Sequence, residues 1–367
     1  MTKVTIIGAG AIGGAIAYEL SLIEGLEITL LEKQFPGSDS TGAALGVLMG
    51  GISRKVKGKP WRWRKTSLQY YETLIPKLVA LTGQPILFNR QGIVKLCFAG
   101  EDVSCWEKLA TKRCSQNWPL EIWDLSQLQA QCPQIENEQV TGAVYSPQDR
   151  QVNPLQLTKA LVAAAEFQGV QCQFGVEVEE IIPDDSHNTT SYILHTNTGT
   201  IDTQWLILAA GNGSTSLTAS LKEPVDIRPV LGQALQVELK QTLGNPEFQP
   251  VITGKDHHIV PLGNNQYWLG ATVEFPDHQG KVVPQTPCLE DLKNHLFSLC
   301  PALSQATIIR TWFGKRPRPE GRPAPIVEEL PGHNQILLAT GHYRNGILLA
   351  PATALAIKSR FVEGCMP

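Results

Sequence analysis

The chain opens with Val4-Thr5-Ile6-Ile7, then Gly8-Ala9-Gly10-Ala11-Ile12-Gly13-Gly14, and after a helical run continues with Ile28-Thr29-Leu30-Leu31-Glu32. This order predicts a buried strand, a glycine turn, a helix, and a second strand that ends in an acid. Gly8 permits the tight turn, Gly10 lets the backbone approach a pyrophosphate, and Gly13 lets the helix sit close to the strand. The unit therefore predicts a site for the ADP half of a dinucleotide.

The acid at the end of the second strand narrows the choice of nucleotide. Glu32 follows the glycine turn by about twenty residues, where an acid accepts hydrogen bonds from ribose hydroxyls. A carboxylate there disfavours a 2′-phosphate, so we expect FAD or NAD rather than NADP. The amides at the start of the helix face the phosphates, where the helix dipole favours negative charge.

Composition places the chain among ordinary globular proteins. Its 367 residues suffice for two domains, with 42% hydrophobic residues, 18% charged residues and a net charge of −3. Because no basic block occurs, we expect no nucleic-acid partner. The longest apolar candidate, residues 346–357, is short and contains Pro351, so we expect no stable membrane insertion. Because the first strand starts almost at Met1, we expect no signal peptide and a cytoplasmic location.

Cysteine spacing predicts neither a disulfide framework nor a metal site. No Cys-x-x-Cys pair and no Cys/His cluster with zinc spacing occurs, and the adjacent His257 and His258 point to opposite faces of a strand. In a reducing compartment we expect free thiols at all eight positions: Cys97, Cys105, Cys114, Cys132, Cys172, Cys288, Cys300 and Cys365.

Hydrophobic periodicity predicts further helices and strands. We expect helices over 61–82, from Asn153 to about 168, and from 347 to about 362. Residues 205–208 form a fully apolar strand that runs into a glycine turn, as a central parallel strand does where it meets a ligand. Other strands are expected at 92–98, 171–174, 191–195, 200–202, 231–239, 258–262, 266–271 and 335–339, with residues 216–315 read as a largely antiparallel sheet.

These pieces predict an α/β protein in which the nucleotide-binding fold is discontinuous. We expect a Rossmann-type domain made of residues 1–57, 145–215 and 318–367. A second domain, with a largely antiparallel substrate-binding sheet, is inserted as residues 58–144 and 216–317.

Four separated blocks resemble the glycine oxidase branch of the D-amino acid oxidase-like flavoproteins. They are residues 8–32, 41–51 and 206–213, and above all Gly341-His342-Tyr343-Arg344-Asn345-Gly346-Ile347-Leu348-Leu349-Ala350-Pro351. Weaker similarity occurs at 92–96, 152–154 and 311–317, so the resemblance covers nearly the whole chain.

The resemblance implies FAD as cofactor. No cysteine stands within 311–317, where some sarcosine oxidases attach flavin, so the FAD is expected to be noncovalent. The matching positions imply cofactor contacts at Gly8, Gly10, Ala11, Ile12, Gly13, Glu32, Lys33, Thr41, Gly42, Ala43, Ala44, Gly46, Val47, Leu48, Val178, Ala209, Gly211, Gly341, His342, Tyr343, Arg344, Asn345, Gly346, Ile347 and Leu348.

The resemblance also implies a reaction. A small amino acid or amine passes a hydride from its α-carbon to flavin N5 and becomes an imine; molecular oxygen then reoxidises the flavin and hydrogen peroxide leaves. In this family the imine can supply thiamine thiazole assembly. Homotetramers occur in the family, so we expect a homo-oligomer.

Two arginines match the family's active-site walls. Arg316 is the implied clamp for the substrate carboxylate, because a planar guanidinium binds a carboxylate bidentately, and Arg344 lines the site beside the flavin. The amides of Gly346, Ile347 and Leu348 at a helix start would stabilise negative charge at flavin N1 and O2.

Two residues depart from the family's pattern. His258 stands where relatives usually carry tyrosine, and we expect it to donate a hydrogen bond to the carboxylate, better when protonated. Lys315 stands where relatives often carry an apolar residue. The departures leave the substrate open among glycine, sarcosine, small D-amino acids and other amines.

Three other functions stay open at this point. A D-amino acid dehydrogenase would pass electrons to a quinone and yield no peroxide. A flavoprotein with a binding role would show little turnover, and a nicotinamide dehydrogenase would lack flavin absorbance.

Overall fold

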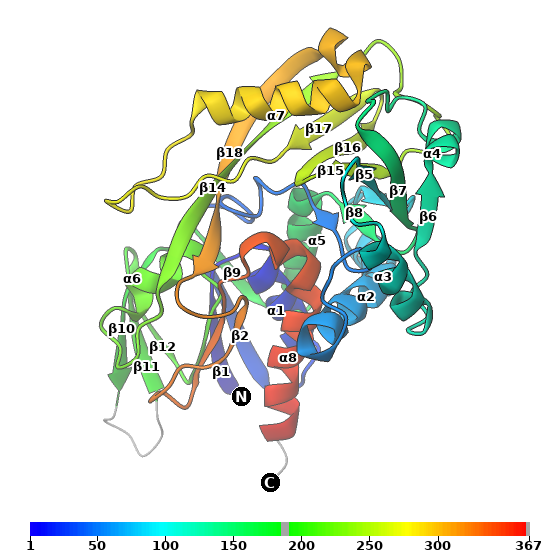
Figure 1. Ribbon diagram of the computed structural model, residues 1–367. Helices are drawn as coiled ribbons and strands as arrows, with labels where there is room; N and C mark the ends of the chain where they lie inside the picture. Colours follow the sequence, from blue (N-terminus) through cyan, green and yellow to red (C-terminus); the bar gives the residue numbers. More distant parts are fainter. Residues whose placement is uncertain (185–190, 365–367) are drawn as a thin grey trace.

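Two large sheets organise the chain. The computed structural model describes residues 1–184 and 191–364. A six-stranded sheet contains the first two strands of the chain, and an eight-stranded sheet lies beyond it, at the top of Figure 1. One long strand, β18 (Thr307–Pro319), runs from the region of the larger sheet down toward the smaller one (Figure 1).

The six-stranded sheet is the expected nucleotide-binding sheet. Five of its strands are parallel and β19 runs antiparallel at one edge. The order across the sheet is β19 (Ile326–Glu329), β20 (Ile336–Thr340), β13 (Trp205–Leu208), β1 (Thr2–Ile7), β2 (Leu26–Glu32) and β9 (Gln171–Phe174). Segments from the start, middle and end of the chain are thus hydrogen-bonded side by side, which confirms the Rossmann-type fold. The domain boundaries themselves stay a prediction.

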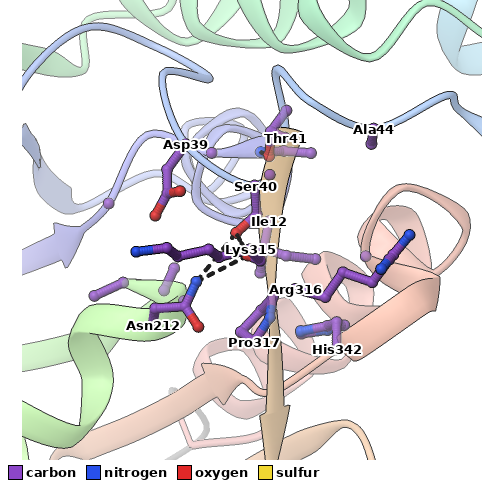
Figure 2. A pocket seen from close by; sticks show the side chains of 18 of the residues that line it. Ile12, Asp39, Ser40, Thr41, Ala44, Asn212, Lys315, Arg316, Pro317 and His342 are labelled. Atoms are coloured by element: carbon purple, nitrogen blue, oxygen red, sulfur yellow. Dashed lines mark hydrogen bonds between the residues drawn. The ribbon is translucent and has the colours of Figure 1, made fainter. Parts of the chain in front are cut away.

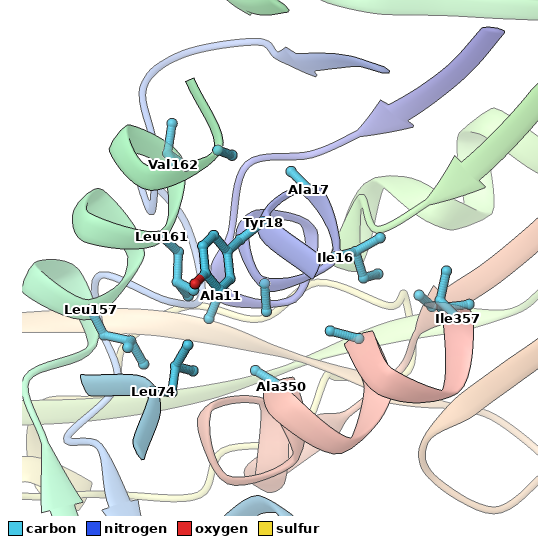
Figure 3. Packing of buried hydrophobic residues seen from close by; sticks show 14 of the residues in the cluster. Ala11, Ile16, Ala17, Tyr18, Leu74, Leu157, Leu161, Val162, Ala350 and Ile357 are labelled. Atoms are coloured by element: carbon cyan, nitrogen blue, oxygen red, sulfur yellow. The ribbon is translucent and has the colours of Figure 1, made fainter. Parts of the chain in front are cut away.

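The first helix packs so closely that it needs small residues. Helix α1 (Ala11–Leu20) lies between α5 (Pro154–Phe167) and α8 (Gly346–Gly364) in a buried apolar cluster (Figure 3). A Cβ at Gly13 would lie 1.8 Å from the carbonyl oxygen of Gly8, and a Cβ at Gly14 would lie 3.4 Å from Val162. Larger residues would push the helix off the glycine turn.

The helices predicted from periodicity are confirmed, with small shifts at their ends. Helix α2 spans Gly58–Thr82 rather than starting at 61, and Trp61, Leu68 and Leu78 are buried on one side of it. Helix α5 begins at Pro154, because the side chain of Asn153 accepts hydrogen bonds from the next two free amides.

The eight-stranded sheet is largely antiparallel, as expected, with one parallel pair between β15 and β5. Its order is β18, β14 (Ile227–Glu238), β17 (Gln266–Gly270), β16 (His257–Gly263), β15 (Val251–Gly254), β5 (Ile93–Phe98), β7 (Val140–Ser146) and β6 (Glu121–Asp124). The expectation of strands throughout 216–315 missed a helix, α7 (Thr286–Leu299), which buries Leu292, Leu296 and Leu299. Those leucines recur at helical spacing.

Two small sheets and three short helices complete the described fold. Strands β11 (Ser191–Thr196) and β12 (Gly199–Thr203) pair as expected, but their third strand, β10 (Val178–Asp184), was not anticipated. The other small sheet has the order β3 (Val47–Leu48), β8 (Arg150–Val152) and β4 (Phe88–Asn89), and the remaining helices are α3 (Ser104–Cys114), α4 (Leu125–Gln131) and α6 (Ser214–Thr218).

Cysteine pairing and membrane-spanning helices were both considered in the described part of the chain. Seven cysteines are free there, as expected, and Cys365 lies outside the described residues. In residues 1–184 and 191–364, no helix combines the length and the apolar character that crossing a bilayer requires.

A buried carboxylate fixes the segment that leads into α2. Asp149 accepts hydrogen bonds from the amides of Gly50, Gly51 and Ile52, at 2.9, 2.6 and 3.1 Å. The fully buried Arg113 donates to the carbonyl of Gly51 at 2.8 Å and lies on the ring of Trp61. Together the two charges satisfy backbone groups on both sides of a loop that has no regular structure.

Replacing Asp149 with alanine should lower the free energy of unfolding by about 3 kcal/mol, because three buried amides lose their acceptor. Urea titration followed by circular dichroism measures the loss. The exposed strand residue Asp202 is the matched control, and Asp202→Ala should change stability by less than about 0.5 kcal/mol. Equal stability of the two variants would contradict this role of Asp149.

Candidate functional site

A deep cavity of about 480 Å³ opens where the parallel strands end. Ile7, Glu32 and Thr340 are the last residues of β1, β2 and β20, and all three line it. The walls also come from β14, β16 and β18 of the larger sheet. The cavity therefore lies at the carboxyl edge of the parallel sheet, where open α/β sheets bind ligands.

The glycine turn brings bare backbone to the cavity wall. Gly8 has φ +102°, and a Cβ there would lie 2.6 Å from the carbonyl oxygen of Ala209, at the end of the neighbouring strand. Gly10 precedes the first turn of α1, and Ala11 and Ile12 line the cavity. This combination of a close backbone approach and a helix start suits a pyrophosphate.

The carboxylate of Glu32 holds this turn in place. Its Oε2 accepts a hydrogen bond from the amide of Ala9 at 2.9 Å, and its Oε1 accepts one from the amide of Gln34 at 3.0 Å. Each carboxylate oxygen has a second lone pair, so Glu32 can still accept bonds from a ribose. The bond to Ala9 gives Glu32 a structural role that the sequence did not reveal.

Strand β18 is fastened to the nucleotide-binding loops where it crosses the cavity. The carbonyl oxygen of Lys315 accepts hydrogen bonds from Ser40 Oγ at 2.6 Å and from Asn212 Nδ2 at 2.9 Å (Figure 2). Three residues before Lys315 on the strand, Trp312 Nε1 donates to the carbonyl of Ala43 at 3.0 Å. These bonds hold Gly314, Lys315, Arg316 and Pro317 in the cavity wall.

The block around 341–348 forms the opposite wall. Gly341 has φ +66° and Tyr343 has φ +52°, so the backbone bends sharply between β20 and α8. His342 is buried, and its Nε2 lies 2.9 Å from Thr353 Oγ1 on α8. The first turn of α8, from Gly346 to Leu348, faces the cavity with its helix N-terminus.

Arg316 lies in the wall with its guanidinium held by backbone. Nη1 donates to the carbonyl of Leu231 at 3.0 Å and Nη2 donates to the carbonyl of Thr272 at 3.0 Å. A Cβ at Gly232 would lie 2.2 Å from Nη2, so only glycine leaves room for the flat group. Burial, together with the nearby charge of Arg344, lowers the pKa of Arg316 to about 10, so it remains a cation at neutral pH.

Arg344 and His258 lie at the same end of the cavity as Arg316. Arg344 Nη2 lies 3.4 Å from Asp256 Oδ1, and His258 Nδ1 lies 3.0 Å from Thr253 Oγ1. The structure thus brings together the three side chains that the sequence singled out for the substrate.

The stronger hydrogen bond expected of a protonated His258 is not available at neutral pH. Removal from water, together with the positive charge of Arg344, lowers the pKa of His258 to about 3. The ring is therefore neutral at physiological pH and offers at most one N–H donor.

Most residues that the resemblance assigned to the cofactor line the cavity, but four do not. Gly13, Gly42, Leu48 and Asn345 lie outside the lining. A Cβ at Gly42 would lie 2.5 Å from the carbonyl of Gly37, so this glycine permits a tight loop rather than a ligand contact. The positions that do line it are Gly8, Gly10, Ala11, Ile12, Glu32, Lys33, Thr41, Ala43, Ala44, Gly46, Val47, Val178, Ala209, Gly211, Gly341, His342, Tyr343, Arg344, Gly346, Ile347 and Leu348.

The sequence reading missed several lining residues. Asn212 stands inside the quoted block 206–213, and Asp39 and Ser40 directly precede the block 41–51, so position in or beside those blocks was an available signal. Asp256 lies in a turn between two strands, and nothing in its local sequence marks it as part of the site.

The cavity fits FAD. Its glycine turn and the start of α1 suit a pyrophosphate, and Glu32 suits a ribose. The start of α8 provides a second set of free amides in the same cavity, next to two arginines. A dinucleotide with an electron-accepting ring needs both helix starts: one stabilises the pyrophosphate, and the other stabilises negative charge on the reduced ring.

Acid should destabilise the protein through His342, whose pKa burial lowers to about 3. In the unfolded chain His342 takes up a proton near pH 6.5, whereas in the folded chain it stays neutral until about pH 3. The free energy of unfolding therefore falls as the pH drops from 6.5 toward 3. Between pH 7 and pH 5 the loss is about 2 kcal/mol for one such histidine. Urea titrations of the apoprotein at both pH values measure this effect. Between pH 7 and pH 5, His342→Gln should lose about 2 kcal/mol less free energy of unfolding than the wild type. The exposed His278 is the control, and His278→Gln should keep the wild-type decline; equal slopes for all three proteins would contradict the assignment.

Comparison with known proteins agrees with this geometry. The model of the family described as "FAD dependent oxidoreductase" matches residues 3–360. The chain is similar to "Bifunctional protein ThiO/ThiG" of Nostoc sp. (strain PCC 7120), with 33% identity over 99% of this chain and 53% of that protein. It is also similar to "Glycine oxidase" of Geobacillus kaustophilus, with 28% identity over 96% of this chain and 91% of that protein.

The fold agrees with that of a solved relative. The crystal structure of glycine oxidase from Geobacillus kaustophilus superposes with a TM-score of 0.87 at 27% identity, covering 99% of this chain and 95% of that one. The chain spans about half the length of the curated ThiO/ThiG relatives, 53% in the case of the Nostoc protein. With the family model matched over nearly all of its length, the chain belongs to the family of FAD-dependent oxidoreductases, and FAD is its cofactor.

Proposed function

We propose that this chain oxidises glycine or another small amino acid or amine, with noncovalently bound FAD. The observation that carries the proposal is Arg316, a cation fixed by two backbone carbonyls in the wall of the FAD cavity. FAD, when bound, supplies the acceptor for the hydride that the substrate loses. The similarity to glycine oxidases supports this substrate class.

Arg316 would bind the substrate carboxylate. Two of its N–H groups are committed to Leu231 and Thr272, and the guanidinium has five, which leaves enough donors for a carboxylate. Because the backbone bonds hold it before the substrate arrives, little side-chain entropy is lost on binding. His258, being neutral, would contribute a single hydrogen bond at most.

Charge that develops on the cofactor would be stabilised by the first turn of α8. Gly346, Ile347 and Leu348 line the cavity, and amides in this turn have no partner within the helix. A general base is not needed, because a neutral amine can lose hydride without prior proton removal from carbon. The chain would then have two tasks: hold the carboxylate at one end and favour negative charge at the other.

The direct test is a substrate panel on the FAD-loaded protein with peroxide detection, using glycine, sarcosine and D-alanine. We expect turnover in air with one peroxide for each substrate oxidised, and bleaching of flavin absorbance without air. Bleaching without peroxide would instead favour a dehydrogenase that uses another acceptor. Failure of every substrate to bleach the flavin would overturn the proposal.

A place in thiamine biosynthesis is part of the proposal. The name ThiO/ThiG of the Nostoc relative supports it, as does similarity over nearly all of this chain. The imine product would then be consumed by an enzyme that assembles the thiazole ring.

Replacing Arg316 with alanine should raise the KM for glycine about 30- to 150-fold, because a charged bidentate contact contributes about 2–3 kcal/mol. The variant should stay yellow, since the nucleotide contacts are elsewhere. Arg310 lies on the same strand but is exposed and outside the cavity, and Arg310→Ala should leave the KM within twofold. A KM unchanged in Arg316→Ala would remove this residue from the clamp.

A further inference from the structure

An ion pair closes the substrate end of the cavity. The turn after β15 carries Asp256, whose Oδ1 lies 3.4 Å from Nη2 of Arg344. Both residues line the cavity, although they lie far apart in the sequence. Asp256 lies in the turn between β15 and β16, and Arg344 lies in the bend before α8. The pair therefore joins the β15–β16 turn to the bend before α8 at the cavity wall.

This pair can be broken. The side chain of Asp256 is 73% exposed and that of Arg344 is 36% exposed, so water replaces the contact at little cost. An exposed ion pair of this kind contributes little to stability, because water screens the two charges. Arg316, in contrast, is held by two carbonyls inside the wall.

The charged side chains that line the cavity at this end sum to one positive unit. Arg316 and Arg344 are cations, Asp256 is an anion, and His258 is neutral. The other buried acid nearby, Glu274, does not line the cavity and is bonded to Gln233 and to the amide of Gln285. Lys315 points away from Arg316, toward Asp39 and Asn212 (Figure 2). One net positive charge matches a substrate with one carboxylate.

We propose that Asp256 determines specificity by serving as an internal counter-anion for Arg344, which restricts the site to substrates with a single carboxylate. A second carboxylate on the substrate reaches Arg344 only by displacing Asp256 and bringing two anions together. Without Asp256, Arg316 and Arg344 form two cationic subsites in one cavity, and the site accepts dicarboxylates. This inference rests on the proposed function, because it assumes that Arg316 binds the first carboxylate.

The test uses unreactive acids on the FAD-loaded protein, with the shift in flavin absorbance as the readout. Acetate probes one carboxylate and malonate probes two. In Asp256→Asn the Kd for malonate should fall about five- to tenfold, whereas the Kd for acetate should change less than twofold. Adding Arg344→Met to Asp256→Asn should abolish the gain for malonate.

Asp39→Asn is the matched control, because Asp39 also lines the cavity but lies toward the nucleotide end, and the change removes the same charge. It should leave the ratio of the malonate and acetate Kd values at the wild-type figure. An unchanged malonate Kd in Asp256→Asn overturns the inference, and so does equal tightening of both acids or the same effect in Asp39→Asn.

The outcomes separate this inference from the proposed function. If acetate perturbs the flavin in every variant but the Kd for malonate does not depend on residue 256, only the inference is overturned. Acetate and malonate that perturb the flavin in none of the variants overturn the carboxylate site and the inference together. In turnover, Asp256→Asn should raise the ratio of kcat/KM for D-aspartate over D-alanine by the same five- to tenfold.

Discussion

The attachment of β18 to the nucleotide-binding loops makes a single site out of two sheets. Three hydrogen bonds join them, from Ser40, Asn212 and Trp312, and all involve backbone carbonyls. Close contact is possible because Gly314 has no side chain: a Cβ there would lie 2.3 Å from the Cβ of Ala43. If the strand stood farther off, Arg316 would leave the cavity in which FAD accepts electrons.

This attachment also explains why neighbouring residues of β18 face different ends of the cavity. Successive side chains of a strand point to opposite faces, so Arg316 is directed to the substrate end and Lys315 to the nucleotide end (Figure 2). The Lys315 carbonyl is the acceptor for two of the three fastening bonds. The contribution of Lys315 to this attachment therefore comes from its main-chain carbonyl. Any other residue at this position could supply the same group.

The sequence predicted the parallel sheet well because its signals are local. Local sequence alone is enough to recognise each of three features: the Gly8–Gly13 turn, the acid at position 32 and the apolar strand 205–208. Helix α7 was missed inside a region read as strands, although its leucines repeat at helical spacing. The substrate end was predicted through Arg316 and Arg344, but Asp256 was not, since its importance comes from a contact with a residue 88 positions away. The neutral state of His258 could not be predicted for a related reason: burial and the Arg344 charge are properties of the folded site.

The contrast between the two arginines shows how one cavity can hold two cations without excess positive charge. Arg316 is satisfied by neutral carbonyl dipoles, which leave its charge available to a ligand. Arg344 is satisfied by a carboxylate at 3.4 Å, which cancels its charge as long as the pair persists. Burial and, after it, repulsion from Arg344 lower the pKa of Arg316, whereas the nearby Glu274 acts in the opposite direction. Under the proposed function, a substrate carboxylate would bind Arg316, whose direct hydrogen-bond partners are neutral, and the amine end would face the cofactor.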